Sequence, residues 1–341
     1  MRACDNPVFV SGEDAAAVFS WRDAIEALRS AYALGNGAAA VPPRTVAQAD
    51  GVWLRTLPAI PAGARYFGAK LMGMSRGSDT PGTEYVIVLY DRQTSRLAAF
   101  VDANLITGYR TAATSAAALD RLAPPNPTRL AVLGSGLEAT MHVRAFASVR
   151  RFEEIVVFSP TPGKREAFAA TMTQELGMPV RAVSSAQAAA SGAQIVLAAA
   201  RSRNESPILH GDWLADDAVV VSIGSTVAEQ RELDVTVIAR AALIVCDNPE
   251  EVAHETGDMI AAAAAGIDLV PKLASLGELM SGALEDRLGA GGIMMFKSVG
   301  AGLQDVVVAG MILDRAKAAD RATLLPIAFD KKLPQQSKDS K

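Results

Sequence analysis

The spacing of apolar positions divides the first third of the chain into a helical segment and a strand-rich segment. Over residues 11–35 apolar side chains recur three or four positions apart, which predicts a helix capped by Ser11. Residues 43–101 form short apolar runs separated by turn residues, which predicts β-strands with a hairpin around residues 91–95. Helical spacing then returns and stops at the prolines of residues 124–127, which we expect to mark a domain boundary.

From residue 129 onward, short and almost continuously apolar runs alternate with helical segments. The runs, of which the third is weak, are RLAVLG, EIVVFS, MPVRAV, QIVLAA, AVVVSIG and ALIVCD. Strands that are apolar on both faces are typical of a parallel sheet covered by helices on both sides. The sequence therefore predicts an α/β fold, with a Rossmann-type doubly wound parallel sheet over residues 127–300 and an N-terminal α/β domain over residues 1–126 with residues 301–330.

The end of the chain and the overall composition add limits to this fold. Residues 301–325 are expected to form one long amphipathic helix that returns to the first domain, and the polar tail of residues 331–341 is expected to be disordered. Hydrophobic residues make up 50% of the chain and the formal net charge is −4, which gives no sign of a nucleic-acid-binding surface. The Ala-rich run at residues 261–265 is too short to cross a membrane.

Cysteine and histidine usage indicates a reducing compartment and no metal. Cys4 and Cys246 are the two cysteines, so a disulfide framework is not expected. The three histidines are scattered at His142, His210 and His254, without a cysteine cluster, so we expect no zinc site. The first ten residues lack the pattern of a signal or transit peptide. We therefore expect a cytoplasmic protein.

The stretch LAVLGSGLEA at residues 130–139 is the most informative local motif. An apolar strand ends at a glycine turn and a helix follows, as in dinucleotide-binding turns. The first glycine permits the tight turn, the second lets the backbone approach a pyrophosphate, and the free N–H groups of the helix bind the phosphates. The candidate cofactor residues here are Gly134, Ser135, Gly136, Leu137, Glu138 and Ala139. The alternative interpretation is an ordinary strand–helix turn.

The segment after the second strand of this domain indicates which dinucleotide is bound. NAD-binding domains usually place an acid there to bind the ribose hydroxyl. Here the strand EIVVF is followed by Ser159 and Thr161, and then by Lys164 and Arg165. Hydroxyl groups and two cations suit a 2′-phosphate, so NADP(H) is favoured and NAD(H) is kept as the alternative. The competing view is that the two cations are solvated helix residues.

Eight blocks of sequence resemble the ornithine cyclodeaminase/μ-crystallin family over nearly the whole chain. The blocks are VPPRT (41–45), GAKLMGM (68–74), ITGYRTAATSAAALDRLA (106–123), LAVLGSGLEA (130–139), SIGSTVAEQRELD (222–234), HETGDM (254–259), LGELMSG (276–282) and FKSVGAGLQD (296–305). The resemblance implies a nicotinamide cofactor and a small α-imino or α-amino acid as substrate. It also implies that the N-terminal domain binds this substrate and forms a homodimer through its sheet.

The resemblance further implies roles for individual side chains. Arg44, Lys70 and Arg110 match the family positions that hold the substrate carboxylate, and fixed cations suit that task. Lys70 is also expected to donate or relay the imine proton, because desolvation and nearby cations lower the pKa of a lysine. Thr111, placed at a helix start, is expected near the cofactor phosphates, with simple helix capping as the alternative. Further cofactor residues are expected at two strand ends, Ala199 and Gly224, and at the nicotinamide, Ser298, Val299 and Gly300.

One departure from the family pattern bears on the reaction. Members that cyclise ornithine carry an aspartate where this chain has Thr226, and a hydroxyl cannot act as a general base near neutral pH without a partner. The resemblance therefore implies NAD(P)H-dependent reduction of a small α-imino acid, or the reverse amino-acid dehydrogenation. Ornithine cyclodeamination and non-catalytic ligand binding are the alternatives. We expect Asp305 to orient a lysine or arginine at the domain junction, and the substrate side chain to lie near Met72, Met74 and Arg76.

Overall fold

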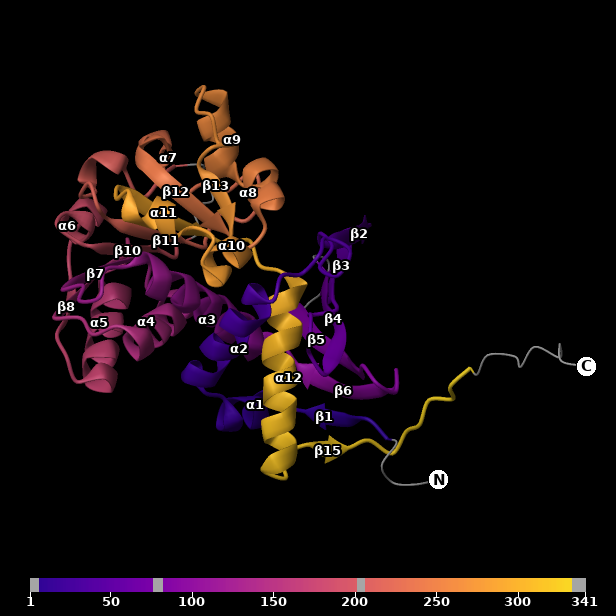
Figure 1. The fold of residues 1–341 in the computed structure, drawn as a ribbon. Coiled ribbons are helices and arrows are strands. Elements are labelled where there is room, and N and C mark those ends of the chain that lie inside the picture. The colour runs from indigo at the N-terminus through magenta and orange to yellow at the C-terminus, as the bar shows by residue number, and fades with distance from the viewer. Residues whose placement is uncertain (1–5, 76–81, 201–205, 333–341) are drawn as a thin grey trace, which may run out of the picture.

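The computed structural model describes residues 6–75, 82–200 and 206–332, which fold around two separate sheets (Figure 1). The strands of the first sheet are β1 (Val8–Val10), β2 (Thr45–Ala49), β3 (Val52–Ala59), β4 (Tyr66–Ser75), β5 (Gly82–Asp91), β6 (Leu97–Asp102) and β15 (Thr323–Leu324). Their order is β15-β1-β6-β5-β4-β3-β2. The strands β2 to β6 pair antiparallel, as expected for a run of hairpins, and β1 joins β6 in parallel.

The second sheet is parallel throughout the described residues. Its strands are β7 (Arg129–Leu133), β8 (Glu154–Phe158), β9 (Val180–Ala182), β10 (Ile195–Ala198), β11 (Val219–Ser222), β12 (Ala241–Cys246), β13 (Leu273–Ser275) and β14 (Ile293–Lys297). Their order is β13-β12-β14-β11-β10-β7-β8-β9. The direction of winding reverses between β7 and β10, and open α/β sheets bind ligands at the carboxyl edge of such a point. The predicted Rossmann-type doubly wound sheet is confirmed.

Helices cover both sheets and connect them. Their bounds are α1 (Gly12–Val18), α2 (Trp21–Ala33), α3 (Asn104–Leu122), α4 (Leu137–Val149), α5 (Pro162–Leu176), α6 (Ala186–Ala190), α7 (Val235–Arg240), α8 (Pro249–Glu255), α9 (Gly257–Ala264), α10 (Leu276–Ser281), α11 (Glu285–Gly289) and α12 (Gly302–Ala318), and a 3-10 turn lies at Gly211–Trp213. Helix α12 returns to the first sheet and packs on β3, β4 and β5 beside α1 and α2 (Figure 1). Helix α3 packs against both α2 and α4, so it joins the two halves.

Small side chains make α3 suitable for this central position. Ala112, Ala113, Ala116 and Ala118 are fully buried, and together they let neighbouring helices approach closely. The proline-rich segment 124–127 falls in the link between α3 and β7. The division of the chain into two domains at that link stays a prediction.

Two predicted helices have different limits in the structure. The helix expected over 11–35 is two helices, because the chain is extended at Phe19 and Ser20. Ser11 caps the first, as predicted, by accepting the Asp14 N–H, and Ser20 caps the second. Helix α12 ends at Ala318 rather than at residue 325, because the chain turns there and β15 pairs with β1.

Strand β14 is the main element that the apolar pattern did not predict. It lies between β11 and β12, and all five of its residues are buried. Strands β1, β13 and β15 were also not predicted, and each has three residues or fewer. The tail predicted to be disordered lies outside the described residues, apart from positions 331 and 332.

Candidate active site

The residues expected to carry the chemistry meet in a cavity of about 180 Å³ between the two halves of the molecule. The carboxyl ends of the parallel strands form one wall, and β3, β4 and α3 form the other. The predicted site residues that line it are Arg44, Lys70, Arg110, Thr111, Glu138, Ala199, Gly224, Thr226, Ser298, Val299 and Gly300. Side chains from distant parts of the sequence therefore face one small space.

Lys70 on β4 and Arg110 on α3 approach each other through a shared acid, Asp305 on α12. The Lys70 Nζ lies 2.9 Å from Asp305 Oδ1, and the Arg110 Nε lies 3.1 Å from the same oxygen. The Lys70 and Asp305 side chains are 1% and 0% exposed. Buried charges are tolerated when they are paired, so Asp305 keeps both cations at the cavity. Asp305 thus contacts both a lysine and an arginine, the two residue types that we expected it to orient.

The surroundings of Lys70 change its acidity. Burial lowers the pKa of Lys70 from 10.5 to about 8, because an ammonium group loses the stabilisation that water gives it. The charge of Asp305 opposes this change and that of Arg110 adds to it. At neutral pH Lys70 is therefore mainly protonated, yet it gives up its proton far more readily than an exposed lysine.

Arg110 is held in place on two sides. Its Nη1 donates to Gln304 Oε1 at 2.7 Å, and the Gln304 amide donates in turn to the Tyr32 hydroxyl and to Asp247. Gly300 has a φ of +85°, and a Cβ at that position would lie 2.6 Å from the same Nη1. The glycine therefore makes room for the guanidinium, in addition to the nicotinamide contact expected from the sequence.

Arg44 reaches the cavity from the segment before β2, but it already has acidic partners. Its Nη2 lies 2.6 Å from Glu255 Oε2 and donates to the Thr226 carbonyl at 3.1 Å, and its Nε lies 3.9 Å from Glu251. These contacts join the first half of the chain to α8. The Nη1 of Arg44 makes no hydrogen bond within the part of the chain that the structure describes.

The predicted position of Thr111 at a helix start is wrong. Helix α3 begins at Asn104, whose N–H donates to the Asp102 carboxylate at 2.9 Å. Thr111 therefore lies in the second turn, and its hydroxyl donates to the Thr107 carbonyl at 2.7 Å. It caps no helix, although it lines the cavity as expected.

Asp247, at the end of β12, fixes the loop that follows β14. It accepts hydrogen bonds from the Ser298 hydroxyl at 2.6 Å and from the N–H groups of Val299 and Gly300 at 3.1 and 2.8 Å. The loop expected beside the nicotinamide thus has its own anchor. The sequence signal for Asp247 was an acid directly after the apolar run ALIVC.

A second buried acid, Glu232, holds the ends of β10 and β11 together. Its carboxylate accepts from the Ala200 N–H at 2.9 Å, the Gly224 N–H at 2.7 Å and the Ser222 hydroxyl at 2.9 Å. Burial raises the pKa of Glu232 to about 7, and the nearby charge of Lys297 opposes that rise. Gly224 is required here, since a Cβ would lie 2.2 Å from Glu232 Oε1.

The glycine turn after β7 has the geometry that a dinucleotide needs. Gly134 has a φ of +126°, and a Cβ there would lie 2.7 Å from the Ala199 carbonyl oxygen. Gly136 precedes α4 without a side-chain cap, so the first N–H groups of the helix are open to a phosphate. Leu137 is 58% exposed, and Ala139 is buried against the sheet. The residues present therefore fit a nicotinamide dinucleotide.

The residues expected to read the ribose lie at the end of β8. The Ser135 hydroxyl donates to the Ser159 hydroxyl at 2.9 Å, which links this end to the glycine turn. The Arg165 Nη1 donates to the Ser159 carbonyl at 3.0 Å, so its guanidinium folds back toward the strand end. Thr161 and Lys164 are exposed at the start of α5. None of these residues lines the inner cavity.

A comparison with family models decides the affiliation of the chain. The model of the ornithine cyclodeaminase/mu-crystallin family matches residues 10–320. The chain belongs to this family. The resemblance drawn from the eight sequence blocks is confirmed, and the similar proteins include reductases of imines.

Three relatives illustrate the similarity of this family member. Ketimine reductase mu-crystallin of Mus musculus is 32% identical over 265 residues, which are 77% of this chain and 80% of that protein. The Δ1-pyrroline-2-carboxylate reductase of Thermococcus litoralis, solved with NADH and L-proline, is 26% identical with a TM-score of 0.85, over 93% of this chain and 100% of that chain. The iminosuccinate reductase of Paracoccus denitrificans, solved with NAD+, is 25% identical with a TM-score of 0.84, over 94% and 100%.

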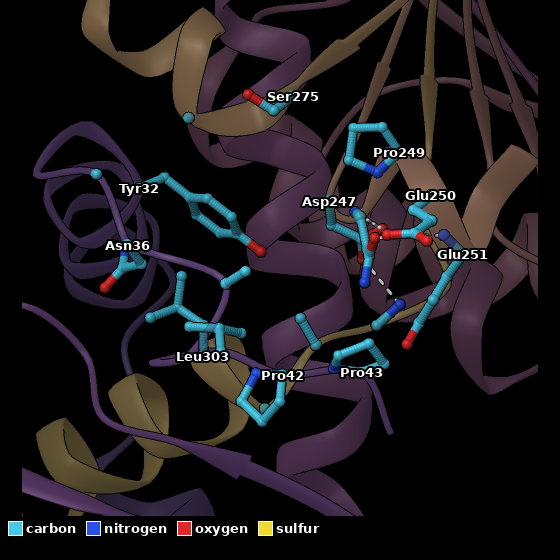
Figure 2. A pocket seen from close by; sticks show the side chains of 18 of the residues that line it. Tyr32, Asn36, Pro42, Pro43, Asp247, Pro249, Glu250, Glu251, Ser275 and Leu303 are labelled. Carbon is cyan, nitrogen blue, oxygen red and sulfur yellow. Dashed lines mark hydrogen bonds between the residues drawn. The ribbon is translucent and has the colours of Figure 1, made fainter. Parts of the chain in front are cut away.

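A larger cavity, of about 510 Å³, lies beside the active-site cavity of this family member. Figure 2 shows it with Tyr32, Pro42 and Leu303 on one side and Asp247 and Glu250 on the other. Its lining includes neither of the two cations that share Asp305 and none of the residues of the glycine turn. Its size alone does not make it the reaction site.

The residues expected near the substrate side chain do not all lie at the active-site cavity. Met72 lines the active-site cavity, whereas Met74 is not among its lining residues, and Arg76 lies outside the described residues. Arg55 was missed, although it lines the cavity. Within the described residues, no helix is long and apolar enough to cross a bilayer. The same residues contain no group of three or more His, Cys, Asp or Glu side chains placed to hold a metal ion.

Proposed function

We propose that this protein reduces small α-imino acids to α-amino acids with a nicotinamide dinucleotide, or catalyses the reverse oxidation. The observation that carries this proposal is that Lys70 and Arg110 both contact Asp305 at one wall of the cavity. The carboxyl ends of the parallel strands form the opposite wall. The fixed cations suit an anionic substrate, and the glycine turn near the opposite wall suits a dinucleotide. Such a cavity can bring the substrate to the cofactor for hydride transfer.

The cations bind and orient the substrate carboxylate. Arg110 is immobilised by Gln304 and Asp305, so its free guanidinium edge is a rigid donor. Lys70 adds a second donor from the sheet. We include Arg44 as the third member of this clamp through its Nη1, since Glu255 and the Thr226 carbonyl already hold its Nη2. A carboxylate fixed in this way presents the imine carbon in one orientation.

Lys70 is the proton donor for the imine nitrogen. Its pKa of about 8 lets it hold a proton at neutral pH and release it when the nitrogen becomes basic. Asp305 keeps the Nζ at the cavity during this transfer. Burial of the Nζ also excludes water, which would otherwise hydrolyse an imine.

The cofactor is held by the second half of the chain and supplies the hydride. The residues that would hold it are Gly134, Ser135, Gly136, Leu137, Glu138 and Ala139 at the phosphates, Thr111, Ala199 and Gly224 between the halves, and Ser298, Val299 and Gly300 at the nicotinamide. We propose NADP(H) as the preferred form, with Ser159, Thr161, Lys164 and Arg165 around the 2′-phosphate. The supporting observation is that Arg165 already lies against the Ser159 carbonyl, at the end of β8 where the ribose of a dinucleotide binds. Fluorescence titration with NADPH and NADH tests this preference, and tighter NADH binding would reject it.

The proposed activity is tested by following NADPH consumption. The purified protein is given pyruvate with methylamine and, separately, Δ1-pyrroline-2-carboxylate. We expect turnover of at least one imine and loss of that turnover in Lys70→Ala with cofactor binding intact. A protein that binds NADPH but reduces no imine would contradict the proposal and would favour a non-catalytic binding role.

The residue at position 226 does not favour ornithine cyclodeamination. Family members that cyclise ornithine carry an aspartate where this chain has Thr226, and a hydroxyl cannot act as a general base near neutral pH without a partner. Ammonia release from ornithine without net NADH production is the outcome that would restore this alternative.

We also propose that the protein is a cytoplasmic homodimer that associates through its first sheet. All five residues of the edge strand β2 are exposed, and apolar side chains are exposed at Val46 on β2 and at Val52 and Leu54 on the neighbouring strand β3. An unpaired apolar edge strand is a surface that a second copy can cover. Light scattering should give twice the chain mass of 35.6 kDa, and a monomeric mass would contradict the proposal.

A further inference from the structure

Arg55 is a fourth cation of the active-site cavity and lies on the same sheet face as Lys70. Strands β3 and β4 pair antiparallel, with Arg55 opposite Met72 and Leu57 opposite Lys70. Because side chains alternate along a strand, Arg55 and Lys70 point to the same side as diagonal neighbours, which in such sheets lie about 7–8 Å apart. Both line the cavity.

Arg55 differs from the other cations because it lacks an acidic partner. Lys70 and Arg110 share Asp305, and Arg44 pairs with Glu255. Across residues 6–75, 82–200 and 206–332, Arg55 makes no ion pair and no hydrogen bond, and its Nε is buried without one.

The guanidinium of Arg55 therefore has an aromatic neighbour but no direct acidic partner among the described residues. Its guanidinium carbon lies 5.3 Å from the centre of the Trp53 ring, a contact that orients the side chain but adds no negative charge. Burial and the nearby Arg44 lower the pKa of Arg55, and the charges of Glu255, Tyr85 and Glu251 oppose this change without contacting the guanidinium directly. A bound anion would give the buried Nε of Arg55 the hydrogen-bond partner that it lacks among the described residues.

We propose that Arg55 binds a second carboxylate of the substrate, and that the preferred substrates are α-imino dicarboxylic acids. This inference rests on the proposed function, because Lys70 and Arg110 must hold the α-carboxylate at the same time. The second carboxylate then lies beside Met72, which is two residues from Lys70 along β4 and opposite Arg55 on β3. In the reaction the imine carbon gains a hydride from NAD(P)H, the nitrogen gains a proton, and the second carboxylate is unchanged.

The dimensions of the cavity favour short diacids. Its volume of about 180 Å³ is bounded by residues expected to contact the nicotinamide as well as the substrate. Met72 pairs with Tyr85 on β5, so Arg55, Met72 and Tyr85 form one row across the sheet at the end of the cavity. We therefore expect the acid with one methylene between its imine carbon and second carboxylate to react faster than the acid with two.

The test compares matched imines that differ only in the second carboxylate. Freshly prepared oxaloacetate and 2-oxobutanoate form one pair, 2-oxoglutarate and 2-oxopentanoate form the other, and each is mixed with methylamine and NADPH. The variants are Arg55→Met, which keeps the length of the side chain, Arg55→Lys, which restores a charge, and Arg22→Met as a control on the exposed start of α2.

We expect the wild-type protein to prefer each diacid over its partner by about tenfold or more in kcat/KM, as a charge-assisted hydrogen bond provides. Arg55→Met should remove this preference, mainly by raising KM, because it lowers kcat/KM for each diacid far more than for its monoacid partner. Arg55→Lys should restore part of it, and Arg22→Met should change neither. Equal slowing of both acids in Arg55→Met, or equal rates for both in the wild type, would overturn the inference while leaving imine reduction intact. Failure to reduce any imine would instead overturn the proposed function, and this inference with it.

Discussion

Replacement of Lys70 by methionine should strongly lower turnover. It should also change stability in a pH-dependent way, so that the stability of the variant relative to the wild type is greater at neutral pH than at alkaline pH. Burial lowers the pKa of Lys70 from 10.5 to about 8. At 1.36 kcal/mol per pKa unit, holding the charged form in the folded state costs about 3 kcal/mol. Below pH 8 both states carry the proton and the wild type bears the whole cost. Between pH 8 and 10.5 the unfolded state binds more protons than the folded state, so wild-type stability rises with pH. Lys70→Met lacks this dependence.

Urea unfolding of both proteins at pH 7 and pH 9.5 measures the effect. The stability of Lys70→Met minus that of the wild type should fall by about 2 kcal/mol between these pH values, with unchanged m-values. Imine reduction by Lys70→Met should fall by roughly 10²–10⁴-fold, as expected when a general acid is lost. A stability difference that is constant with pH would refute the lowered pKa of Lys70. Retained turnover would refute its role as proton donor.

Three further substitutions test other parts of the site. Asp305→Asn should lower the pKa of Lys70 further, because the Asp305 charge and hydrogen bond both raise it. The alkaline limb of the plot of kcat/KM against pH should then move down by about one pH unit. An alkaline limb that does not move would count against the contact between Asp305 and Lys70. Arg165→Ser should weaken NADPH binding by roughly tenfold in a fluorescence titration while leaving NADH unchanged, and equal losses would reject its role at the 2′-phosphate. Gly134→Ala should cost roughly 1–3 kcal/mol of stability and weaken both cofactors, because its Cβ would meet the Ala199 carbonyl oxygen at 2.7 Å; a stable variant that binds cofactor normally would contradict this.

Much of the fold follows from the apolar pattern, because a strand buried on both faces must be apolar along its whole length. This rule predicted β7, β8, β10, β11 and β12 correctly. It did not lead to β14, a five-residue strand that directly follows two glycines and lies between strands distant in sequence. It also gave one helix where two capped helices meet at Ser20, because residues 11–35 keep apolar spacing across the break.

The cations of the candidate site were predictable from the family pattern, whereas most of their partners were not. Asp305 is 235 residues from Lys70, and only the packing of α12 on β4 brings them together. Arg44 contacts Glu255, which is 211 residues away, and this contact also forms only when the chain folds. Helix α3 begins at Asn104, seven residues before Thr111, and no residue with a capping side chain stands at its N-cap position Ala103 to mark that start in the sequence. Arg55 looked like one of many alternating strand residues until the register placed it beside Lys70.

The proposed reaction requires that Lys70 and Arg110 bind the carboxylate of a substrate whose α-carbon faces the nicotinamide. A crystal structure with oxidised cofactor and a bound α-amino acid product tests it most directly. We expect carboxylate oxygens about 3 Å from the Lys70 Nζ and the Arg110 guanidinium, with the α-carbon directed toward the loop of residues 298–300. A product carboxylate bound away from both cations would contradict it.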